Sequence, residues 1–460
     1  MNAIKTLLAL LAAVGVLALA GCRGLSTSGE RQARHDLGAV AGQYRPGDQR
    51  PALPKLTPDS SLSNFLAYAL LNSPSVEAAY DDWAASVERI TLERSLPDPQ
   101  ITFQSDIADI VKTVMPGFLQ EFPGPGKLSE RAAVASAESR AKFFAFESAA
   151  LQTAFDLKQA CYELYFLNDQ LRINRETLSL LNDLERIART QNEVGKGTLQ
   201  DVLRAQIERD RVRTDIANLE DSRRPMLASF KAALGLTPGQ PDPPVPAQLE
   251  TTAAIPDFNE LLRIAFARNP QLKGMEAEVR AAEAGIAVAY KERVPDFSLG
   301  LMADVKASPT LFRPLGGTTL PIWRDKIAAE IAQAKANELA ARARLSAAQI
   351  ALTVDFAEQA FAGREIDRNL DLLENQLVPK ARQSLEIARA GYLAGTIDFF
   401  NLMDTERTLL NFELSEVEAR TQREIVLSRL SLLIAGEPPA GITLISEATI
   451  NQPATTKISK

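Results

Sequence analysis

The sequence predicts a mainly α-helical protein with a small β portion, and three observations lead to this fold class. Two long stretches space their apolar residues as coiled-coil helices do. Short segments ahead of each stretch alternate apolar and polar residues, which is the period of a β-strand. The chain after residue 58 also divides into two similar halves. An internal duplication of this size indicates two copies of one structural unit.

The alignment of the two halves supports the duplication. Pro74 matches Pro270 with a shift of 196 residues, and the segment around Gly195 matches that around Gly395 with a shift of 200. Pro-rich stretches separate the parts. We expect a tether at 22–58, a first repeat at 59–240, a Pro-rich connection at 241–256, a second repeat at 257–437 and a C-terminal tail at 438–460. The tether is polar and rich in proline, so we expect it to be extended.

Each repeat shows the same order of predicted elements. A helix near 60–96, or 257–293 in the second copy, ends at a break that contains proline. Alternating segments follow, with Phe297, Leu299 and Leu301 against Asp296, Ser298 and Asp304 in the second copy. Returning strands are predicted near 113–122 and 311–322. A very long helix then runs to about residue 192, or 392 in the second copy, which is on the order of 95 Å.

Both long helices stop at glycines. Gly195 and Gly197 stand between the first long helix and a descending one, and Gly391 and Gly395 stand at the equivalent place in the second copy. Glycine costs roughly 1 kcal/mol relative to alanine inside a helix, so a pair of glycines indicates a turn. The sequence therefore predicts two antiparallel helical hairpins with tips at 194–198 and 394–398.

The composition leaves little for enzyme chemistry. The 460 residues are 46% hydrophobic and 24% charged, with a net charge of -7. This acidic balance, without a block of Lys or Arg, argues against nucleic acid as a partner. His35 is the only histidine, and Cys22 and Cys161 are the only cysteines. Such a set leaves almost nothing from which to build a zinc site, a Cys–His pair or a Ser-His-Asp triad. We expect no enzyme activity, no metal and no cofactor.

Residues 1–21 have the pattern of a secretory signal peptide. Lys5 precedes the apolar run 7–20, which is shorter than the about 20 residues of a membrane-spanning helix. The run ends in Leu19-Ala20-Gly21-Cys22, which resembles the bacterial lipobox, whose cysteine becomes the lipidated first residue of the mature chain. The resemblance implies a lipid anchor on Cys22, and Arg23 after it favours the outer membrane. An ordinary signal peptide followed by a chance cysteine is the alternative.

The predicted strands require copies of the chain. Four strands cannot close a barrel, and lipid does not tolerate open sheet edges. A trimer would supply 12 strands, within the bacterial range. The residues Phe297, Leu299 and Leu301 would face lipid, and Asp296, Ser298 and Asp304 would face the lumen. An ordinary soluble sheet with one wet face is the alternative.

At this point the sequence resembles the TolC family of outer-membrane efflux proteins. The features that carry the resemblance are the duplicated unit, the lipobox, the "FPGPGKL" junction at 122–128, and the glycine tips followed by "DVLRAQ" at 201–206 and "NLMDTE" at 401–406. The resemblance covers roughly residues 60–436. It implies a homotrimeric duct in the outer membrane of a Gram-negative bacterium. The duct would continue into the periplasm as a helical barrel, dock on a periplasmic adaptor and receive substrate from an inner-membrane pump.

The resemblance also implies which residues form the gate. In the family, acidic side chains just beyond the tips line the narrowest part of the lumen, and the matching positions are Asp201 and Asp404. Asp398 lies nearer the second tip and is a further candidate. A ring of three carboxylates about 6 Å apart repels by about 3 kcal/mol per pair at an effective dielectric of 20, so it favours cations. For Asp201 and Asp398 a helix-capping role is equally open. Asp404 lies too far into its helix to cap it.

Two arginines occupy equivalent places before the tips. Arg189 and Arg389 either form salt bridges of a closed gate, or contact the adaptor, or simply complement the ends of their helices. Family members that place a basic residue just after the turn glycine differ from this chain, which has Gly197 and Ile397 there. The sequence therefore leaves undecided which residue pairs hold the gate closed.

Two other classes of protein are alternatives. A periplasmic adaptor is also often a lipoprotein with a coiled coil, but it would have one hairpin flanked by Gly-rich β modules. A lipid-anchored enzyme or metal-binding protein would need reactive residues that this chain lacks.

Overall fold

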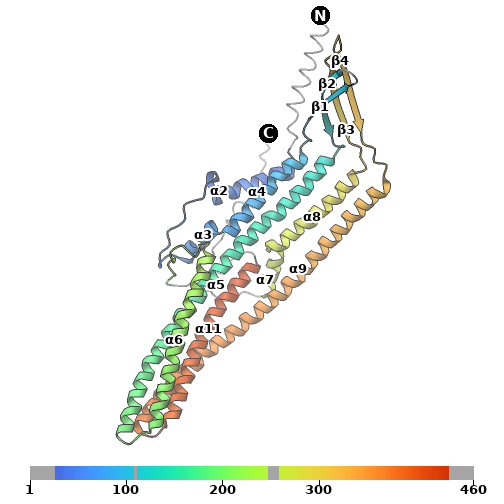
Figure 1. Cartoon of the computed structure of the whole chain (residues 1–460). Helices are drawn as coiled ribbons and strands as arrows, with labels where there is room; N and C mark the ends of the chain where they lie inside the picture. Colours follow the sequence, from blue (N-terminus) through green and yellow to red (C-terminus); the bar gives the residue numbers. More distant parts are fainter. Residues whose placement is uncertain (1–25, 108–110, 247–257, 435–460) are drawn as a thin grey trace, which may run out of the picture. The chain divides into compact units, whose positions relative to one another are not determined.

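The computed structural model describes residues 26–107, 111–246 and 258–434, and Figure 1 shows the order of its elements. The predicted signal peptide, the lipid anchor at Cys22 and the predicted tail at 438–460 lie outside the described residues. The chain divides into two compact units. The first comprises 1–49, 78–147 and 270–349, and the second comprises 50–77, 148–269 and 350–460. Among the described residues, no helix has both the length and the apolar character needed to cross a bilayer.

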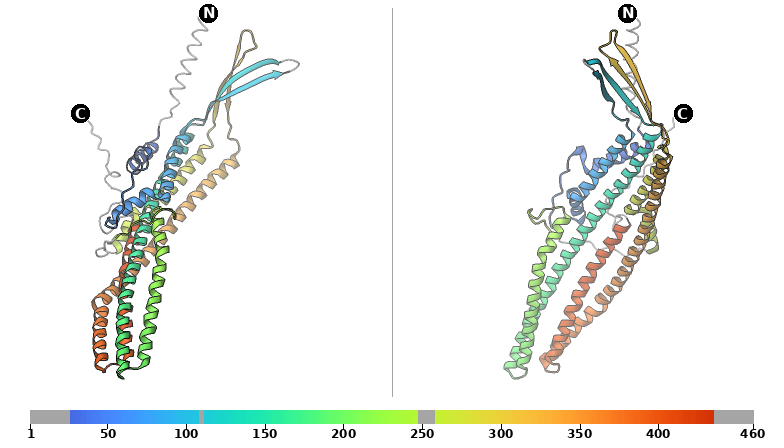
Figure 2. Two further views of the ribbon diagram at one scale, coloured as in Figure 1. Left: turned by 60° about the vertical axis from the view of Figure 1, so that its left-hand side comes forward. Right: turned by 45° about the vertical axis from the view of Figure 1, so that its right-hand side comes forward.

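The first unit contains one antiparallel sheet of four strands in the order β1-β2-β3-β4 (Figure 2). The strands are β1 (Gln100–Ile107), β2 (Val111–Phe122), β3 (Phe297–Asp304) and β4 (Leu311–Thr318). The alternation read from the sequence therefore predicted the type of these segments correctly. β2 and β3 join the two repeats, with Phe122 opposite Phe297 and Gly117 opposite Met302.

The two faces of the sheet differ as the alternation requires. Phe297 and Leu299 on β3 are exposed, whereas Met302 and Asp304 are buried. The expectation that Asp296 faces a lumen from this strand is wrong, because Asp296 precedes β3 and is held at the root of the sheet. Its carboxylate accepts a hydrogen bond from the Gly124 N–H at 2.7 Å and contacts the Lys127 ammonium at 3.0 Å.

Lys127 is the centre of an ion cluster that joins the two repeats at this root. Its side chain is 3% exposed, and its Nζ also lies 3.4 Å from a carboxylate oxygen of Glu292. The "FPGPGKL" junction explains the close approach, since a side chain at Gly124 would collide with the carbonyl of Pro295. Gly126 adopts a φ of 84°, which favours glycine. The junction therefore fixes both hairpins of the sheet to the first long helix.

We expect Lys127→Met to lower the free energy of local opening at this root by about 1–3 kcal/mol, because two carboxylates lose their shared cation. The effect stays below that of a fully buried pair, since Glu292 and Asp296 remain partly solvated. Hydrogen exchange of the peptides around 122–131 measures it. Lys326→Met is the matched control, because Lys326 is 71% exposed. Equal effects of the two substitutions would contradict the proposed role.

Part of the segment 22–58, which was expected to be an extended tether, forms a helix. α2 (Ser28–Tyr44) begins at Thr27, whose side chain caps it by accepting from the Glu30 N–H. The expectation was wrong because Glu30, although charged, is 1% exposed and binds Arg94 and Thr91 of another helix. Composition alone does not reveal such a tertiary anchor.

Aromatic residues form a packed group in the first unit. Trp83 on α4 (Pro74–Arg94) is 1% exposed and packs on Phe143 and Phe146 of the long helix α5 (Lys127–Glu193). Tyr44 at the end of α2 packs against Phe146 and Tyr80. α2 is thus held by aromatic contacts at one end and by ion pairs at the other.

Prolines divide both of the helices predicted at the start of each repeat. The first is α3 (Leu62–Asn72) followed by α4, and the second is α7 (Phe258–Arg268) followed by α8 (Pro270–Lys291). The prediction of one continuous helix was wrong in both copies. Pro74 and Pro270 lack the N–H that a continuous helix needs, and proline is well suited to the first position of a new one.

The second long helix also differs from the first. α5 runs for 67 residues without a break. Its counterpart consists of α9 (Arg324–Leu372), a π-helical turn at Leu373–Leu377 and α10 (Val378–Ala394). The Val378 N–H bonds to the carbonyl of Leu373, five residues back. Pro379 follows and has no N–H to offer the preceding turn, which accounts for the widened turn at this point.

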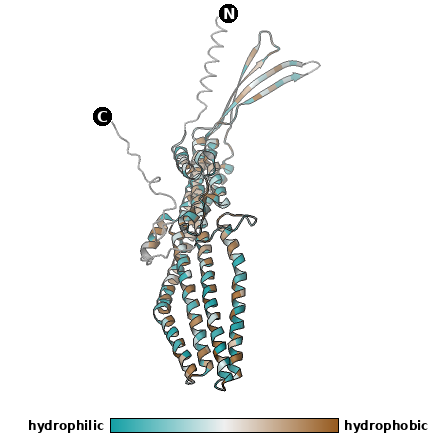
Figure 3. Ribbon diagram, turned by 90° about the vertical axis from the view of Figure 1, so that its left-hand side faces the viewer, coloured by the Kyte–Doolittle hydropathy of each residue, from teal (hydrophilic) through white to brown (hydrophobic). Residues whose placement is uncertain are grey.

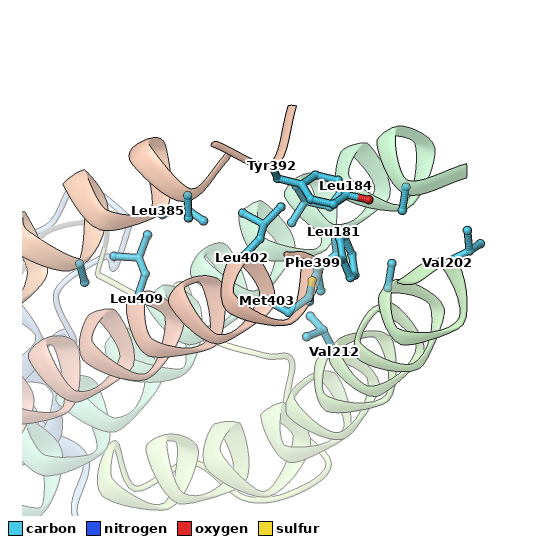
Figure 4. Packing of buried hydrophobic residues seen from close by; sticks show 14 of the residues in the cluster. Leu181, Leu184, Val202, Val212, Leu385, Tyr392, Phe399, Leu402, Met403 and Leu409 are labelled. Atoms are coloured by element: carbon cyan, nitrogen blue, oxygen red, sulfur yellow. The ribbon is translucent and has the colours of Figure 1, made fainter. Parts of the chain in front are cut away.

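The second unit contains the two predicted helical hairpins. α5 is followed by α6 (Leu199–Ala233), and α10 by α11 (Phe399–Leu433). α6 and α11 have the same bounds with a shift of 200, as the duplication predicts. Figure 3 shows apolar residues along these helices, interleaved with polar ones. The buried apolar residues of all four helices form one cluster near the tips (Figure 4).

Candidate functional site

The glycine turns occur where the sequence predicts them. Gly195 and Gly395 both adopt a φ of 75°, in the left-handed region that ends a helix without steric cost for glycine. Gly197 has a different reason, because a side chain there would meet Gln191 at 3.1 Å. Its N–H donates to the Gln191 carbonyl at 2.9 Å and so closes the first turn. The first turn thus needs both of its glycines.

Two of the predicted gate acids cap the helices that follow these turns. Asp201 forms a capping box, in which its carboxylate accepts from the Thr198 N–H at 3.0 Å and its own N–H donates to the Thr198 hydroxyl at 3.3 Å. Asp398 accepts from the Asn401 N–H at 2.8 Å. The capping interpretation of both residues is therefore confirmed. A part in the gate stays a prediction for each of them.

Asp404 lies on the exposed side of α11 and caps nothing. It lines a cavity of about 230 Å³ between α6 and α11, together with Arg204, Glu208, Phe400 and Arg407. Among the described residues, no hydrogen bond or ion pair holds its carboxylate. Arg204 instead lies over the ring of Phe400, 5.1 Å from its centroid. Asp404 is thus a free negative charge two turns beyond the tip, which suits the predicted pore role.

The two tip arginines differ in their surroundings. Arg189 contacts Glu185 at 2.9 Å, and Glu185 also contacts Arg209 of α6 at 2.5 Å and accepts from the Gln206 amide at 2.9 Å. These four side chains form a network within the first hairpin. The bonds to Gln206 and the arginines hold the pKa of Glu185 low, against the opposing effect of burial. Arg389 has no ion pair among the described residues of the second hairpin.

Tyr392 is a site residue that the sequence analysis missed. It lies on α10 one turn before the second tip, is 7% exposed, and packs against Phe399 with ring centroids 5.2 Å apart (Figure 4). Its hydroxyl is buried and has no hydrogen-bond partner in the described structure. Burial raises its pKa, and the negative charge of Asp201 raises it further. Tyr392 therefore places a polar group of one hairpin near a charge of the other.

Glu406 is the second residue that was missed. Its side chain is buried on α11, with the residue 4% exposed, and it makes no hydrogen bond or ion pair among the described residues. Burial raises its pKa to about 7, and the nearby Glu208 adds to this rise while Arg407 opposes it. The only signal in the sequence is that Glu406 aligns with Gln206 of the first repeat. Its burial depends on packing that the sequence pattern does not reveal.

The architecture matches solved outer-membrane channels. The model aligns with the outer membrane protein VceC of Vibrio cholerae at a TM-score of 0.69 and 17% identity, over 82% of this chain and 96% of that one. It aligns with the MtrE outer membrane channel of Neisseria gonorrhoeae at a TM-score of 0.69 and 18% identity, over 82% of this chain and 89% of that one. The fold is therefore that of the outer-membrane channels, with a helical tube and a β portion.

The sequence identifies the family. The family model described as outer membrane efflux protein matches residues 66–236 and 261–436, one segment in each repeat. The chain belongs to the outer membrane efflux protein family, which consists of channel proteins of the Gram-negative outer membrane. It is also 27% identical over 181 residues to the pyoverdine export outer membrane protein OpmQ of Pseudomonas putida. That alignment spans 37% of this chain and 36% of the relative.

Proposed function

We propose that three copies of the chain form a passive, gated exit duct of an efflux system. The four-stranded sheets would close a 12-stranded barrel in the outer membrane, and the helical hairpins would form the walls of a periplasmic tube. The tips would dock on a periplasmic adaptor, which an inner-membrane pump supplies with substrate. The duct itself would do no chemistry, and the pump would choose the substrate.

The sheet carries this proposal. In the described chain, β1 and β4 each pair on one side only, so both edges of the sheet are open. The residues of β4 are all exposed, and Phe312 on this strand is 62% exposed. Backbone groups at an open edge cannot remain unpaired in lipid. Because the sheet has four strands in the part of the chain that the structure describes, copies of the chain are the natural source of the missing ones.

The tips support the proposal of a gate. Asp404 presents an unpaired carboxylate, and a three-fold arrangement would bring three of these charges together. Such a ring would attract cations and resist tight closure. The buried hydroxyl of Tyr392 lies within the field of Asp201 and has no hydrogen-bond partner among the described residues. We propose that these residues, with Arg389, change their contacts when the adaptor docks.

The rival class, a periplasmic adaptor, has less support. An adaptor would have one hairpin, whereas the described chain has two, whose descending helices α6 and α11 each have 35 residues. Membership in the outer membrane efflux protein family also favours the channel.

The number of copies tests the proposal directly. Native mass spectrometry of the protein purified from outer membranes should give a species of about three times the 50.1 kDa calculated for the whole chain, after allowance for signal-peptide removal and acyl chains. Separation of the two membranes should place it in the outer one. A hexamer, or a location in the inner membrane, would contradict the duct and favour the adaptor.

We also propose that Cys22 carries the lipid anchor. Intact-mass measurement should then show acyl chains on the wild-type protein, and Cys22→Ser should remove them. Cys161→Ser is the matched control, because Cys161 is 1% exposed and burial raises the pKa of its thiol to about 12. This control should keep the full lipid mass. An unmodified wild-type chain that begins after an ordinary cleavage site would overturn the lipid anchor but not the channel.

A further inference from the structure

The two hairpins differ at one polar site, although their helices align without a gap at the tips. In the first hairpin, Glu185 forms salt bridges with Arg189 of its own helix and Arg209 of α6. It also accepts a hydrogen bond from the Gln206 amide of α6. The shift of 200 residues that relates the hairpins places Leu385, Arg389, Glu406 and Leu409 at these four positions.

Glu406 is therefore a buried carboxyl that lacks the polar contacts found at the equivalent site of the first hairpin. Leu385 and Leu409 are buried members of the apolar cluster and offer Glu406 no polar atom. Gln206, at the same position of the first hairpin, is neutral and bonded. The acid of the second hairpin is thus on α11 beside an apolar seam, where Leu385 and Leu409 stand in place of Glu185 and Arg209.

The charges that act on Glu406 come from α6 and from its own helix. Glu208 on α6 repels its negative form, and Arg407 on α11 attracts it, although Arg407 is already paired with Glu208. The described residues of α5 and α10 bring no charge that shifts the pKa of Glu406. A cavity of about 230 Å³ is lined by Glu208, Arg407 and Asp404, the two charged groups that act on Glu406 among them.

We propose that Glu406 is a proton-binding site that controls how tightly the second hairpin packs at the mouth of the duct. With a proton bound, Glu406 fits the apolar seam and the hairpin stays packed. Without it, the carboxylate must leave the seam, and it can move to Arg389 of the same hairpin, which has no ion pair among the described residues. The inference rests on the proposed function, since it describes the gate of the proposed duct.

The sign of the pH effect follows from linkage. The pKa of Glu406 is raised in the packed hairpin to about 7 and returns towards the ordinary value of 4.5 when the side chain reaches water. Packing is therefore favoured at acid pH and loses stability as the pH rises from about 5 through 7. A difference of 2.5 pKa units between the states is a change of at most about 300-fold in the packing equilibrium per chain.

Conductance of the full-length protein in planar bilayers tests the proposal. We expect the open probability of the wild type to rise between pH 4.5 and pH 7.5, with its midpoint between the two pKa values of 4.5 and about 7. Glu406→Gln places in the second hairpin the residue that the first already has, so it should stay at the low-pH level throughout. Glu208→Gln removes the repulsion on Glu406 and should move the midpoint to lower pH. Glu386→Gln is the control that should keep the midpoint, because Glu386 is an exposed acid on α10 of the same hairpin.

Hydrogen exchange gives a second readout that does not depend on the pore. After correction for the intrinsic rate, peptides from 378–409 in the wild type should lose protection as the pH rises through 7. Peptides from 181–209 of the first hairpin, which have the satisfied network, should not. In Glu406→Gln the two hairpins should behave alike.

The outcomes separate this inference from the proposed function. Absence of conductance at any pH in wild type and variants would overturn the duct. A conducting wild type whose openings do not change between pH 4.5 and 7.5, or a Glu406→Gln variant that keeps the wild-type midpoint, would overturn the role of Glu406 alone.

Discussion

Replacing Phe399 by alanine is expected to loosen the second hairpin tip by about 3–5 kcal/mol, the cost of a large cavity in a core. Phe399 is the first residue of α11, is 2% exposed, and packs against Tyr392 of α10. It belongs to the cluster that also holds Val202 and Leu184 of the first hairpin, as Figure 4 shows. Its loss therefore removes contacts within and between the hairpins.

The neighbouring residue is the matched control for this change. Phe400 is 59% exposed, and its one described ring contact is with the guanidinium of Arg204. An exposed cation–π contact of this kind contributes about 0.5–1 kcal/mol, so Phe400→Ala should have a small effect. Hydrogen exchange of the peptides from 378–409 gives the free energy of local opening for both variants. Similar losses in the two variants would contradict the packing described for the tip.

The second large effect on local stability is expected near the start of the described chain, where Glu30 anchors α2. Its carboxylate contacts Arg94 at 2.5 Å, accepts from the Thr91 hydroxyl at 2.9 Å, and contacts Arg34 at 3.2 Å. Removal of one member of a buried ion pair costs about 3–5 kcal/mol, because the partner keeps its charge without compensation. We therefore expect Glu30→Ala to detach α2, and limited proteolysis at 28–44 with mass detection measures this.

Glu88→Ala provides the comparison, since Glu88 binds the same Arg34 from a 63% exposed position. Exposed ion pairs contribute about 0–1 kcal/mol, so α2 should stay protected in this variant. If Glu88→Ala were cleaved as fast as Glu30→Ala, burial of the pair would not be what holds α2.

Acid should have the same effect as Glu30→Ala on the wild-type protein. Burial alone would raise the pKa of Glu30, but the bonds from Arg94, Thr91 and Arg34 outweigh it and hold the pKa below its usual value of 4.5. A carboxyl with a lowered pKa stabilises the folded state above its unfolded pKa, and this contribution is lost as the pH falls through the folded value. Cleavage within α2 by an acid-active protease should thus rise in the wild type and in Glu88→Ala as the pH falls below 4.5, whereas Glu30→Ala should be cleaved over the whole pH range.

Much of the fold could be predicted from the sequence because it depends on local patterns. The alternation around Phe297 and Leu299 predicted a strand, and the glycines at 195 and 395 predicted the turns at which both adopt a φ of 75°. The duplication doubled the signal, since a weak pattern in one repeat had a counterpart in the other. Pro74 and Pro270 were each expected inside a continuous helix, whereas each begins a new helix.

The rest could not be predicted because it depends on distant contacts. The polar composition of the segment before residue 58 predicted a tether, and only the position of Arg94 shows why Glu30 can be buried there. The alignment of Gln206 with Glu406 was present in the sequence. The consequence of this alignment depends on the register between the two helices of each hairpin. That register brings Gln206 to Glu185 in the first hairpin, whereas Glu406 has no such partner among the described residues.

The central claim is that this chain forms a passive duct through the outer membrane, and single-channel recording tests it most directly. Purified full-length protein added to a planar lipid bilayer should produce discrete, stable current steps without any energy source. Cations should be favoured over anions, and Asp404→Asn should weaken that preference. Correctly folded trimeric protein that inserts into the bilayer and gives no current steps at any pH would contradict the account.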